Sequence, residues 1–460
     1  MADAGDEDLT RKLTDLLTAW PADAQDVLAR ARLLLLDGLG VAVAGAGEPG
    51  PRMAAELARA DQAAPVATVI GHGFATSLTG AARVNGMAMH VLDFEPMWHP
   101  ANHALSSLLP ALLGLAEQRE AGGAPAQGRE LLIALAKGVE IQGRLRLSSG
   151  QMESHELTLH PPGAVGSLAA AAAVGTFLGF DAQRMAMAVG TAASRLGGIM
   201  ANVGTMTKAL HCGDAAAHGL EAALLAEKGF TADVDALGGP RGWGRSLFGP
   251  RFDPAPILAP LEVPRILTPG PAWKLFPSQY GTHFAITAAL EARGAIADPR
   301  DIEAVTLHLP SMPYLDRPAP ASGLAGKFSW QYVASVALLD GRVDPASFAD
   351  QRRFAPDMEA MLRRVKLEYD ASIPARFDLM HVSIAVRLKD GTLIERRCDA
   401  PLGNWRRPAP AEAVKQKARG LLNEALGPEK AGRLLELISA PADRLSIRPV
   451  MANLNVRLTP

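Results

Sequence analysis

Apolar residues recur at helical spacing from Leu9 to about Phe248. Alanine and leucine dominate this part of the chain, and glycine or proline interrupts it at intervals typical of helix lengths. A run of small residues, Ala169–Ala173, would let two helices approach closely. The pattern predicts successive helices, of which the clearest are Ala104–Glu120, Gly128–Leu147, Ala164–Phe180, Ala182–Ser194 and Asp214–Lys228.

The pattern changes at Pro250–Pro271, where seven prolines disfavour a long helix and indicate a crossing segment. Beyond it, apolar and polar residues alternate at Val305–Leu309 and again at Val382–Leu388. Such a period of two predicts strands. Helical spacing lies between them, at Phe328–Leu339 and Asp357–Val365, so this part of the chain is expected to be α+β.

After Pro408, helical spacing returns at Glu412–Leu426 and Glu429–Ile438. The simplest arrangement returns this tail to the first group of helices. We therefore predict a mainly α fold with two domains. Both chain ends, residues 1–270 and 400–460, would form a large all-helical domain, and residues 271–399 would form a smaller α+β domain.

Composition narrows the possible functions. Hydrophobic residues make up 48% of the 460 residues and charged residues 20%, which is typical of a soluble globular protein. The net charge of -2 provides no general attraction to nucleic acid or to an anionic membrane, so we expect neither as a partner. Cys212 and Cys398, the two cysteines, are far apart, which suits a reducing compartment and gives no zinc or iron–sulfur spacing.

The N-terminal sequence MADAGDEDLT is acidic and lacks the basic and apolar regions of a signal peptide. The most apolar stretches, Leu33–Ala46 and Gly166–Gly179, are shorter than the roughly 20 residues that cross a bilayer. We expect both to be buried helices of a cytoplasmic protein.

The segment NGMAMHVLDFEPMWHPANH, residues 85–103, concentrates titratable side chains. Histidine titrates near neutral pH and is suited to acid/base catalysis. A surface loop rich in histidine and a chance metal site are the alternatives. His99 and His103 have the spacing of zinc ligands on a helix, but Pro100 argues against a regular helix there. The segment contains His90, Asp93, Glu95, His99 and His103.

Two further segments pair histidine with other polar groups. In TMTKALHCGDAAAHG, Lys208 and His211 are three residues apart and would share one face at a helix start, a suitable carboxylate site. A solvated charged turn is an equally good interpretation. In HELTLHPPG, His160 precedes a rigid Pro-Pro-Gly turn, although a lone histidine is more often structural than catalytic.

The segment WKLFPSQYGTH, residues 273–283, lies at the predicted domain junction. Its polar side chains could face a cleft, since ligand sites often form between domains. An ordinary interdomain hinge is the alternative. The side chains concerned are Lys274, Gln279, Tyr280 and His283.

Together these segments resemble the MmgE/PrpD family, which includes 2-methylcitrate dehydratases, cis-aconitate decarboxylases and iminodisuccinate epimerases. The resemblance spans nearly the whole chain, in segments such as NGMAMHVLDF, HPPGAVGSLAAAAAVGTFLGFD, TKALHCGDAAAHGLEAALLAEKGF, KLFPSQYGTH and KFSWQYVASVALLDGRV. The stretches DFEPMWHPANH, GGIMANVGTMTKALHCG and LGNWRRP look closest to the cis-aconitate decarboxylase branch. The resemblance implies that the smaller domain is a lid on the helical domain.

By this resemblance, five residues match positions that line the decarboxylase active site, and we take them as candidate catalytic residues: Asp93, His103, His160, Lys208 and Tyr314. Two others belong to family motifs and are candidate substrate-binding residues, Lys274 and His211. The chain departs from the family pattern at Met97, in place of a threonine, and at Gln279, in place of a histidine. These two positions would alter substrate recognition.

The resemblance implies a homodimeric lyase that needs neither metal nor organic cofactor and acts on a small di- or tricarboxylate. In that hypothesis Lys208 and Lys274 bind carboxylates, and His103 donates a proton to a carbanion with Asp93 orienting it. His160 is a second acid/base group, and Tyr314 excludes water from the lid side. An epimerase of an amino- or imino-dicarboxylate and a non-catalytic metabolite-binding homologue are the alternatives.

Overall fold

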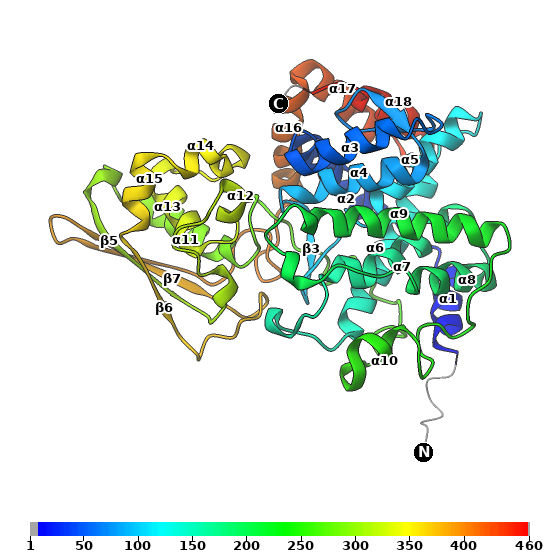
Figure 1. Ribbon diagram of the computed structural model, residues 1–460, viewed down its shortest axis with the longest axis horizontal. Helices are drawn as coiled ribbons and strands as arrows, with labels where there is room; N and C mark the ends of the chain where they lie inside the picture. Colours follow the sequence, from blue (N-terminus) through cyan, green and yellow to red (C-terminus); the bar gives the residue numbers. More distant parts are fainter. Residues whose placement is uncertain (1–7, 459–460) are drawn as a thin grey trace.

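The structure, a computed structural model, describes residues 8–458 and is mainly helical (Figure 1). Two bodies of elements lie side by side, a larger helical one and a smaller one with a sheet. The larger contains α1 (Leu9–Ala19), α2 (Gln25–Gly45), α3 (Pro49–Ala60), α4 (Leu78–Val91), α5 (Leu109–Ala121), α6 (Gly128–Ser148), α7 (Pro161–Phe177), α8 (Ala182–Ala193), α9 (Thr207–Glu227), α10 (Trp243–Phe248), α16 (Ala411–Leu426), α17 (Pro428–Ser439) and α18 (Ile447–Leu454). It also holds two small hairpins, β1 (Ala67–Val69) with β2 (Phe74–Thr76) and β3 (Met97–Trp98) with β4 (Asn102–His103).

The C-terminal helices pack on the N-terminal ones, above and beside α2 in Figure 1. One hydrophobic core joins buried residues between 9 and 273 with buried residues between 414 and 454. Helix α16 lies so close to α2 that a Cβ added at Gly40 would be 3.1 Å from the Cα of Ala418. Between the same helices, buried Lys417 contacts buried Asp37 at 2.9 Å. The two ends of the chain therefore share one core.

Small residues bring the central helices together, as the run Ala169–Ala173 predicted. A Cβ added at Gly138 of α6 would lie 2.7 Å from the Cβ of Ala173, and one added at Gly219 of α9 would lie 2.4 Å from that of Ala170. Helix α7 is thus packed closely against α6 and α9, and α9 is one of the elements that carry the site.

The smaller body holds α11 (Thr282–Arg293), α12 (Gly323–Gly326), α13 (Trp330–Asp340), α14 (Asp350–Arg353), α15 (Pro356–Leu362), β5 (Ile302–Leu309), β6 (Val365–Tyr369), β7 (Val382–Leu388) and β8 (Leu393–Cys398). Its four strands form one sheet in the order β6-β5-β7-β8, parallel between β5 and β6 and otherwise antiparallel. Helices α11 and α13 contact the sheet, and a second hydrophobic core lies between them and it. The proposed domain limits at 270/271 and 399/400 remain a prediction.

Two strands differ from the sequence prediction. The helix expected over Asp357–Val365 ends at Leu362, and Val365 begins β6, while β8 was not predicted. In β8 the exposed charged residues Glu395–Arg397 interrupt the alternation, whereas in β6 Val365, Leu367 and Tyr369 alternate with charged Lys366 and Glu368. The strands expected at Val305–Leu309 and Val382–Leu388 are present.

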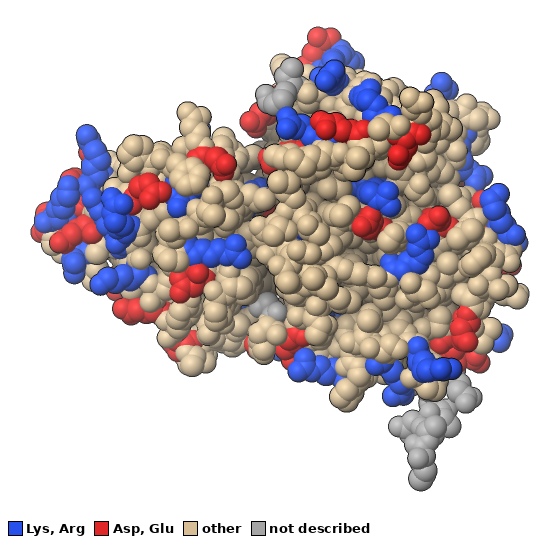
Figure 2. Space-filling view, viewed as in Figure 1, with Lys and Arg blue, Asp and Glu red and all other residues tan. Residues whose placement is uncertain are grey.

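Acidic and basic side chains are interspersed on the face drawn in Figure 2, so neither sign dominates it. Among residues 8–458, no helix is both long and apolar enough to cross a bilayer.

Candidate active site

The end of helix α4 and the hairpin after it position titratable side chains of the site, among them Asp93 and His103. Ser77 caps the start of α4 by accepting a hydrogen bond from the Gly80 amide. After the helix, Asp93 adopts a left-handed conformation with φ of 52°, which is uncommon for a residue other than glycine. The β3–β4 hairpin pairs Met97 with His103 and brings His103 back beside Asp93.

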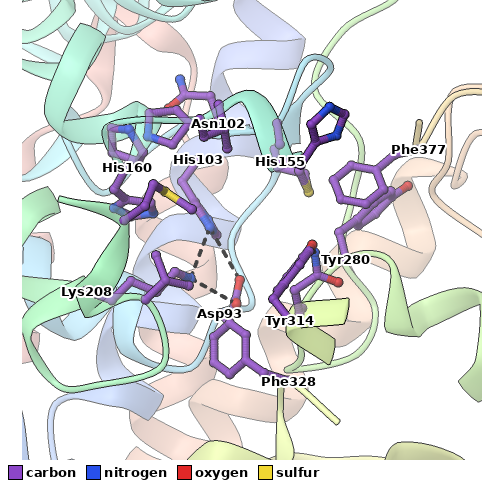
Figure 3. A pocket seen from close by; sticks show the side chains of 18 of the residues that line it. Asp93, Asn102, His103, His155, His160, Lys208, Tyr280, Tyr314, Phe328 and Phe377 are labelled. Carbon is purple, nitrogen blue, oxygen red and sulfur yellow. Dashed lines mark hydrogen bonds and ion pairs between the residues drawn. The ribbon is translucent and has the colours of Figure 1, made fainter. Parts of the chain in front are cut away.

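The Asp93 carboxylate is the centre of a buried ionic cluster (Figure 3). Its Oδ1 lies 2.6 Å from Lys274 Nζ and 3.4 Å from His103 Nε2, and its Oδ2 lies 3.0 Å from Lys208 Nζ. Burial alone would raise the pKa of Asp93, but the charges of Lys208 and Lys274 outweigh it and hold the pKa well below its usual range. Burial lowers the pKa of Lys274 to about 8, although Asp93 opposes this. Asp93 is therefore ionised and bridges two lysines.

A second carboxylate lies at the other ring nitrogen of His103. The Oε1 of Glu95 is 3.4 Å from His103 Nδ1 and 3.0 Å from His90 Nδ1. Its Oε2 accepts hydrogen bonds from the Leu105 and Ser106 amides, at 2.8 and 2.7 Å. The helix expected from Ala104 starts only at Leu109, as α5.

Burial dominates the electrostatics of this inner layer. Glu95 is fully buried, and this raises its pKa from the usual 4.5 to about 7 despite its hydrogen bonds to Ser106 and Leu105. Burial also lowers the pKa of His90 and of His103 well below 6.5, with Lys208 adding to the effect. In the empty site at neutral pH both imidazoles are thus uncharged, and Glu95 is divided between its two protonation states.

His160 is the N-cap of α7, and Pro161–Gly163, expected as a rigid turn before the helix, form the first turn of the helix itself. Its ring centroid is 6.0 Å from that of His103, and its Nδ1 is 3.4 Å from His211 Nδ1. Burial lowers the pKa of His160 well below 6.5. Lys208 and His211 lie on the first turns of α9, which begins at Thr207 rather than near Asp214.

These side chains open into a cavity of about 420 Å³ between the two bodies. Eight of the nine predicted site residues line it: Asp93, Met97, His103, His160, Lys208, Lys274, Gln279 and Tyr314. The ninth, His211, is not among the lining residues and lies behind His160. The direct substrate contact expected of His211 remains a prediction. Its position next to His160 favours a different role, in which His211 holds the His160 ring in place.

The side chains from the smaller body face the ionic cluster across the cavity (Figure 3). Tyr314 follows β5 on a short helical turn, and its hydroxyl accepts a hydrogen bond from Gln279 Nε2 at 2.8 Å. Tyr280 also lines the cavity, as the segment at residues 273–283 suggested, whereas His283 is buried in α11. His99 lies apart from the cluster and pairs with Asp378 at 3.3 Å.

Among the described residues, one group has ring nitrogens close enough to suggest a metal site, namely His90, His103 and His160, within 4.8 Å of one another. His99 does not belong to it, so the zinc pair considered from spacing is not formed. Lys208 Nζ lies 3.5 Å from His103 Nε2, and this positive charge would oppose a cation there.

The sequence matches the MmgE/PrpD N-terminal domain over residues 11–255 and the MmgE/PrpD C-terminal domain over residues 276–440. The chain belongs to the MmgE/PrpD family. It is 33% identical over 427 residues to a cis-aconitate decarboxylase of Mus musculus. The alignment covers 91% of this chain and 87% of the relative. The chain is 32% identical to the cis-aconitate decarboxylase of Homo sapiens, with 90% and 87% covered. A 2-methylcitrate dehydratase of Cupriavidus necator is 26% identical, with 84% and 83% covered.

Two members of the cluster in this MmgE/PrpD protein were not among the predicted site residues. His90 and Glu95 are among the titratable residues of the segment 85–103, but nothing in the sequence indicates that they contact His103. The helical spacing of His90 on α4 and its apolar neighbours are typical of a buried position, and this was the only available signal.

Proposed function

We propose that the protein is a lyase that removes carbon dioxide or water from a small di- or tricarboxylate by general acid/base catalysis, without a cofactor. The observation that carries this is the buried Asp93 carboxylate, which holds two lysines and lies next to the His103 imidazole on the cavity wall. Similarity to cis-aconitate decarboxylases and a 2-methylcitrate dehydratase supports the reaction class.

The lysines supply the carboxylate site. An ammonium group has three donors, and Asp93 occupies one on each lysine. The remaining donors of Lys208 and Lys274 can hold a substrate carboxylate, and the buried surroundings strengthen that attraction. Asp93 keeps both ammonium groups in place before substrate arrives, so less ordering is needed on binding.

Loss of carbon dioxide leaves its electron pair on carbon, and a proton must be delivered to that carbon. His103 Nε2 faces the same lysine that holds the carboxylate, at 3.5 Å. A bound anion favours the imidazolium form of His103, and carboxylates at both ring nitrogens stabilise it. His103 is therefore protonated when substrate binds and donates the proton to the carbanion. In a dehydration the same group assists departure of hydroxide.

His160 and Tyr314 complete the site. His160 lies on the cavity wall beside His103 and is a second acid/base group or substrate contact. Tyr314 comes from the smaller body and reaches the opposite side of the cavity. With Gln279 it covers the cluster and limits the access of water to a carbanion.

Epimerisation is the second candidate. An epimerase needs two groups that remove and return the α-proton on opposite faces of one carbon. His103 and His160 both line the cavity with ring centroids 6.0 Å apart, which leaves them as two separate proton carriers.

The two functions and a non-catalytic role are distinguished by incubating the protein with a panel of di- and tricarboxylates in deuterium oxide and following proton NMR. A lyase gives a product that has lost carbon dioxide or water, whereas an epimerase gives deuterium exchange at the α-carbon without loss of mass. Binding without exchange or product, across the panel, would refute catalysis.

A further inference from the structure

The cavity wall is divided into a polar and an apolar side. Asp93, His103, His160, Lys208 and Lys274 lie together on one side. The rest of the wall is largely apolar apart from the Asn102 amide; Tyr280, Tyr314 and Phe377 face the cluster from across the cavity, and Phe328 lies beside Lys208 (Figure 3). The apolar side chains that matter here are Met97, Leu157, Met200, Val203, Phe328 and Phe377.

The polar side compensates few negative charges. Its two lysines are matched by one aspartate, which leaves one positive charge in excess. Without a bound anion His103 and His160 are neutral, because burial lowers the pKa of each well below 6.5, and the protonation of His103 proposed on substrate binding adds one positive charge. His155 lines the cavity but is largely exposed, and its Nδ1 lies 3.3 Å from Glu153.

Two other cations near the site point elsewhere. Lys327 donates to the Leu92 carbonyl at 3.2 Å, and Arg317 donates to the Tyr314 carbonyl at 3.0 Å from behind Phe328. Neither lines the cavity. A compact trianion would therefore bring one carboxylate that the described wall does not neutralise even with His103 protonated, and burying an uncompensated charge is strongly unfavourable.

The hydroxyl groups on the apolar side are uncharged, so they offer a ligand hydrogen bonds but no positive charge. The Tyr280 hydroxyl accepts from Asn404 at 3.2 Å, and the Tyr314 hydroxyl accepts from Gln279 at 2.8 Å. Gln279 is a neutral amide, so it adds no charge. The side of the cavity opposite the lysines is thus better suited to a hydrocarbon group than to a second or third carboxylate.

We infer that the substrate is a dicarboxylate bearing an alkyl or aryl substituent, with one carboxylate on Lys208 and Lys274 and the substituent against Met97, Val203 and Phe377. This inference rests on the proposed function and names its substrate class. The apolar wall would then determine substrate specificity, because burying a hydrocarbon group against it is favourable and burying an additional charge there is unfavourable.

The test is a binding series on the unmodified protein, measured by calorimetry with methyl-, ethyl-, propyl- and butylmaleate and with cis-aconitate. Each methylene that enters the wall should tighten Kd about fourfold. Butylmaleate should bind more tightly than cis-aconitate. A flat or reversed series, or cis-aconitate as the tightest ligand, would overturn the inference and leave the proposed lyase function intact.

Two variants test whether the apolar wall causes the difference in binding between butylmaleate and cis-aconitate. Val203→Lys adds a cation to the apolar wall and should weaken butylmaleate and strengthen cis-aconitate, changing the ratio of the two Kd values at least tenfold. Val234→Lys makes the same change at an exposed position outside the cavity and should leave the ratio unchanged. An unchanged ratio in folded Val203→Lys would contradict the assignment. If that variant does not fold, the chain-length series decides. Failure of every acid to bind would instead count against the proposed function.

Discussion

Replacing Glu95 with glutamine tests whether the carboxylate behind His103 supports catalysis. Glutamine has the same shape, and its oxygen can still accept hydrogen bonds from the Leu105 and Ser106 amides. Its NH2 group would face the Nδ1 atoms of His90 and His103, where Glu95 Oε1 now lies at 3.0 and 3.4 Å. The variant therefore keeps the backbone contacts, removes the negative charge and replaces an acceptor with a donor.

Both changes oppose the imidazolium form of His103, which needs an acceptor at each ring nitrogen. General acid/base catalysis contributes about 100-fold to 10,000-fold, so kcat of Glu95→Gln should fall on the order of 100-fold or more. The ionisation of Glu95, with a pKa of about 7, should also give the unmodified protein a kcat that rises with pH through neutrality. In the Glu95→Gln variant, kcat should not rise with pH through neutrality.

The pH dependence of protein stability provides a second, independent test of the raised pKa of Glu95. Because the folded pKa of Glu95 is raised from 4.5 to about 7, its contribution is fully present below pH 4.5 and is lost as pH rises through 7. The loss corresponds to about 3 kcal/mol. The Tm of Glu95→Gln relative to the unmodified protein should therefore increase between pH 5 and pH 8.

The assay is turnover by NMR across pH 5 to 9, together with thermal unfolding at the same pH values. Glu120→Gln is the matched control, since Glu120 is also buried and accepts backbone hydrogen bonds from Gln127, Ile447 and Arg448 but does not line the cavity. The control should keep kcat and its pH profile. Near-normal kcat in Glu95→Gln, with the same pH profile, would refute the role of Glu95.

Four further outcomes are expected. His103→Ala should lower the rate of the chemical step on the order of 100-fold or more, measured at enzyme excess, and near-normal turnover would transfer the acid role to His160. Lys208→Ala should raise KM at least as much as it lowers kcat, because the lysine holds a carboxylate in the ground state as well as in the transition state. KM of the unmodified protein should rise above about pH 8, as Lys274 loses its proton, and a constant KM to pH 9.5 would contradict the proposed carboxylate contact. Activity should survive exhaustive chelation with EDTA, and its loss and recovery on adding one metal would reassign His90, His103 and His160 as ligands.

The helical part of the fold followed from the sequence because long amphipathic or small-residue helices leave a strong periodic signal. Most of its predicted helices are present, with ends displaced by a few residues. The larger errors are at helix starts: α5 begins at Leu109 rather than at Ala104, and α9 extends back to Thr207 through glycine-containing sequence. Strand β8 lacks an alternating buried face, so periodicity could not indicate it, whereas the alternation in β6 is present but spans only five residues.

Placement of the site came mainly from the family resemblance. Spacing alone left each motif nearly balanced between a functional and a structural role, whereas the structure places eight of the nine predicted residues around one cavity. Their catalytic and binding roles remain proposals. The contacts of Glu95 and His90 depend on how a loop folds back on helix α4, and the apolar wall combines residues from both bodies. Neither arrangement has a local sequence signal.

Acid/base lyase chemistry at His103 can be tested by comparing the unmodified protein and His103→Ala on cis-aconitate, substituted maleates and 2-methylcitrate in deuterium oxide, at enzyme excess. The unmodified protein should give a product that has lost carbon dioxide or water from at least one acid. When carbon dioxide is lost, the product should carry one deuterium at the protonated carbon. The rate should fall at least 100-fold in the variant while its fold is retained. Equal rates in the two proteins, or no product and no exchange from any acid in the unmodified protein, would contradict acid/base lyase chemistry at His103.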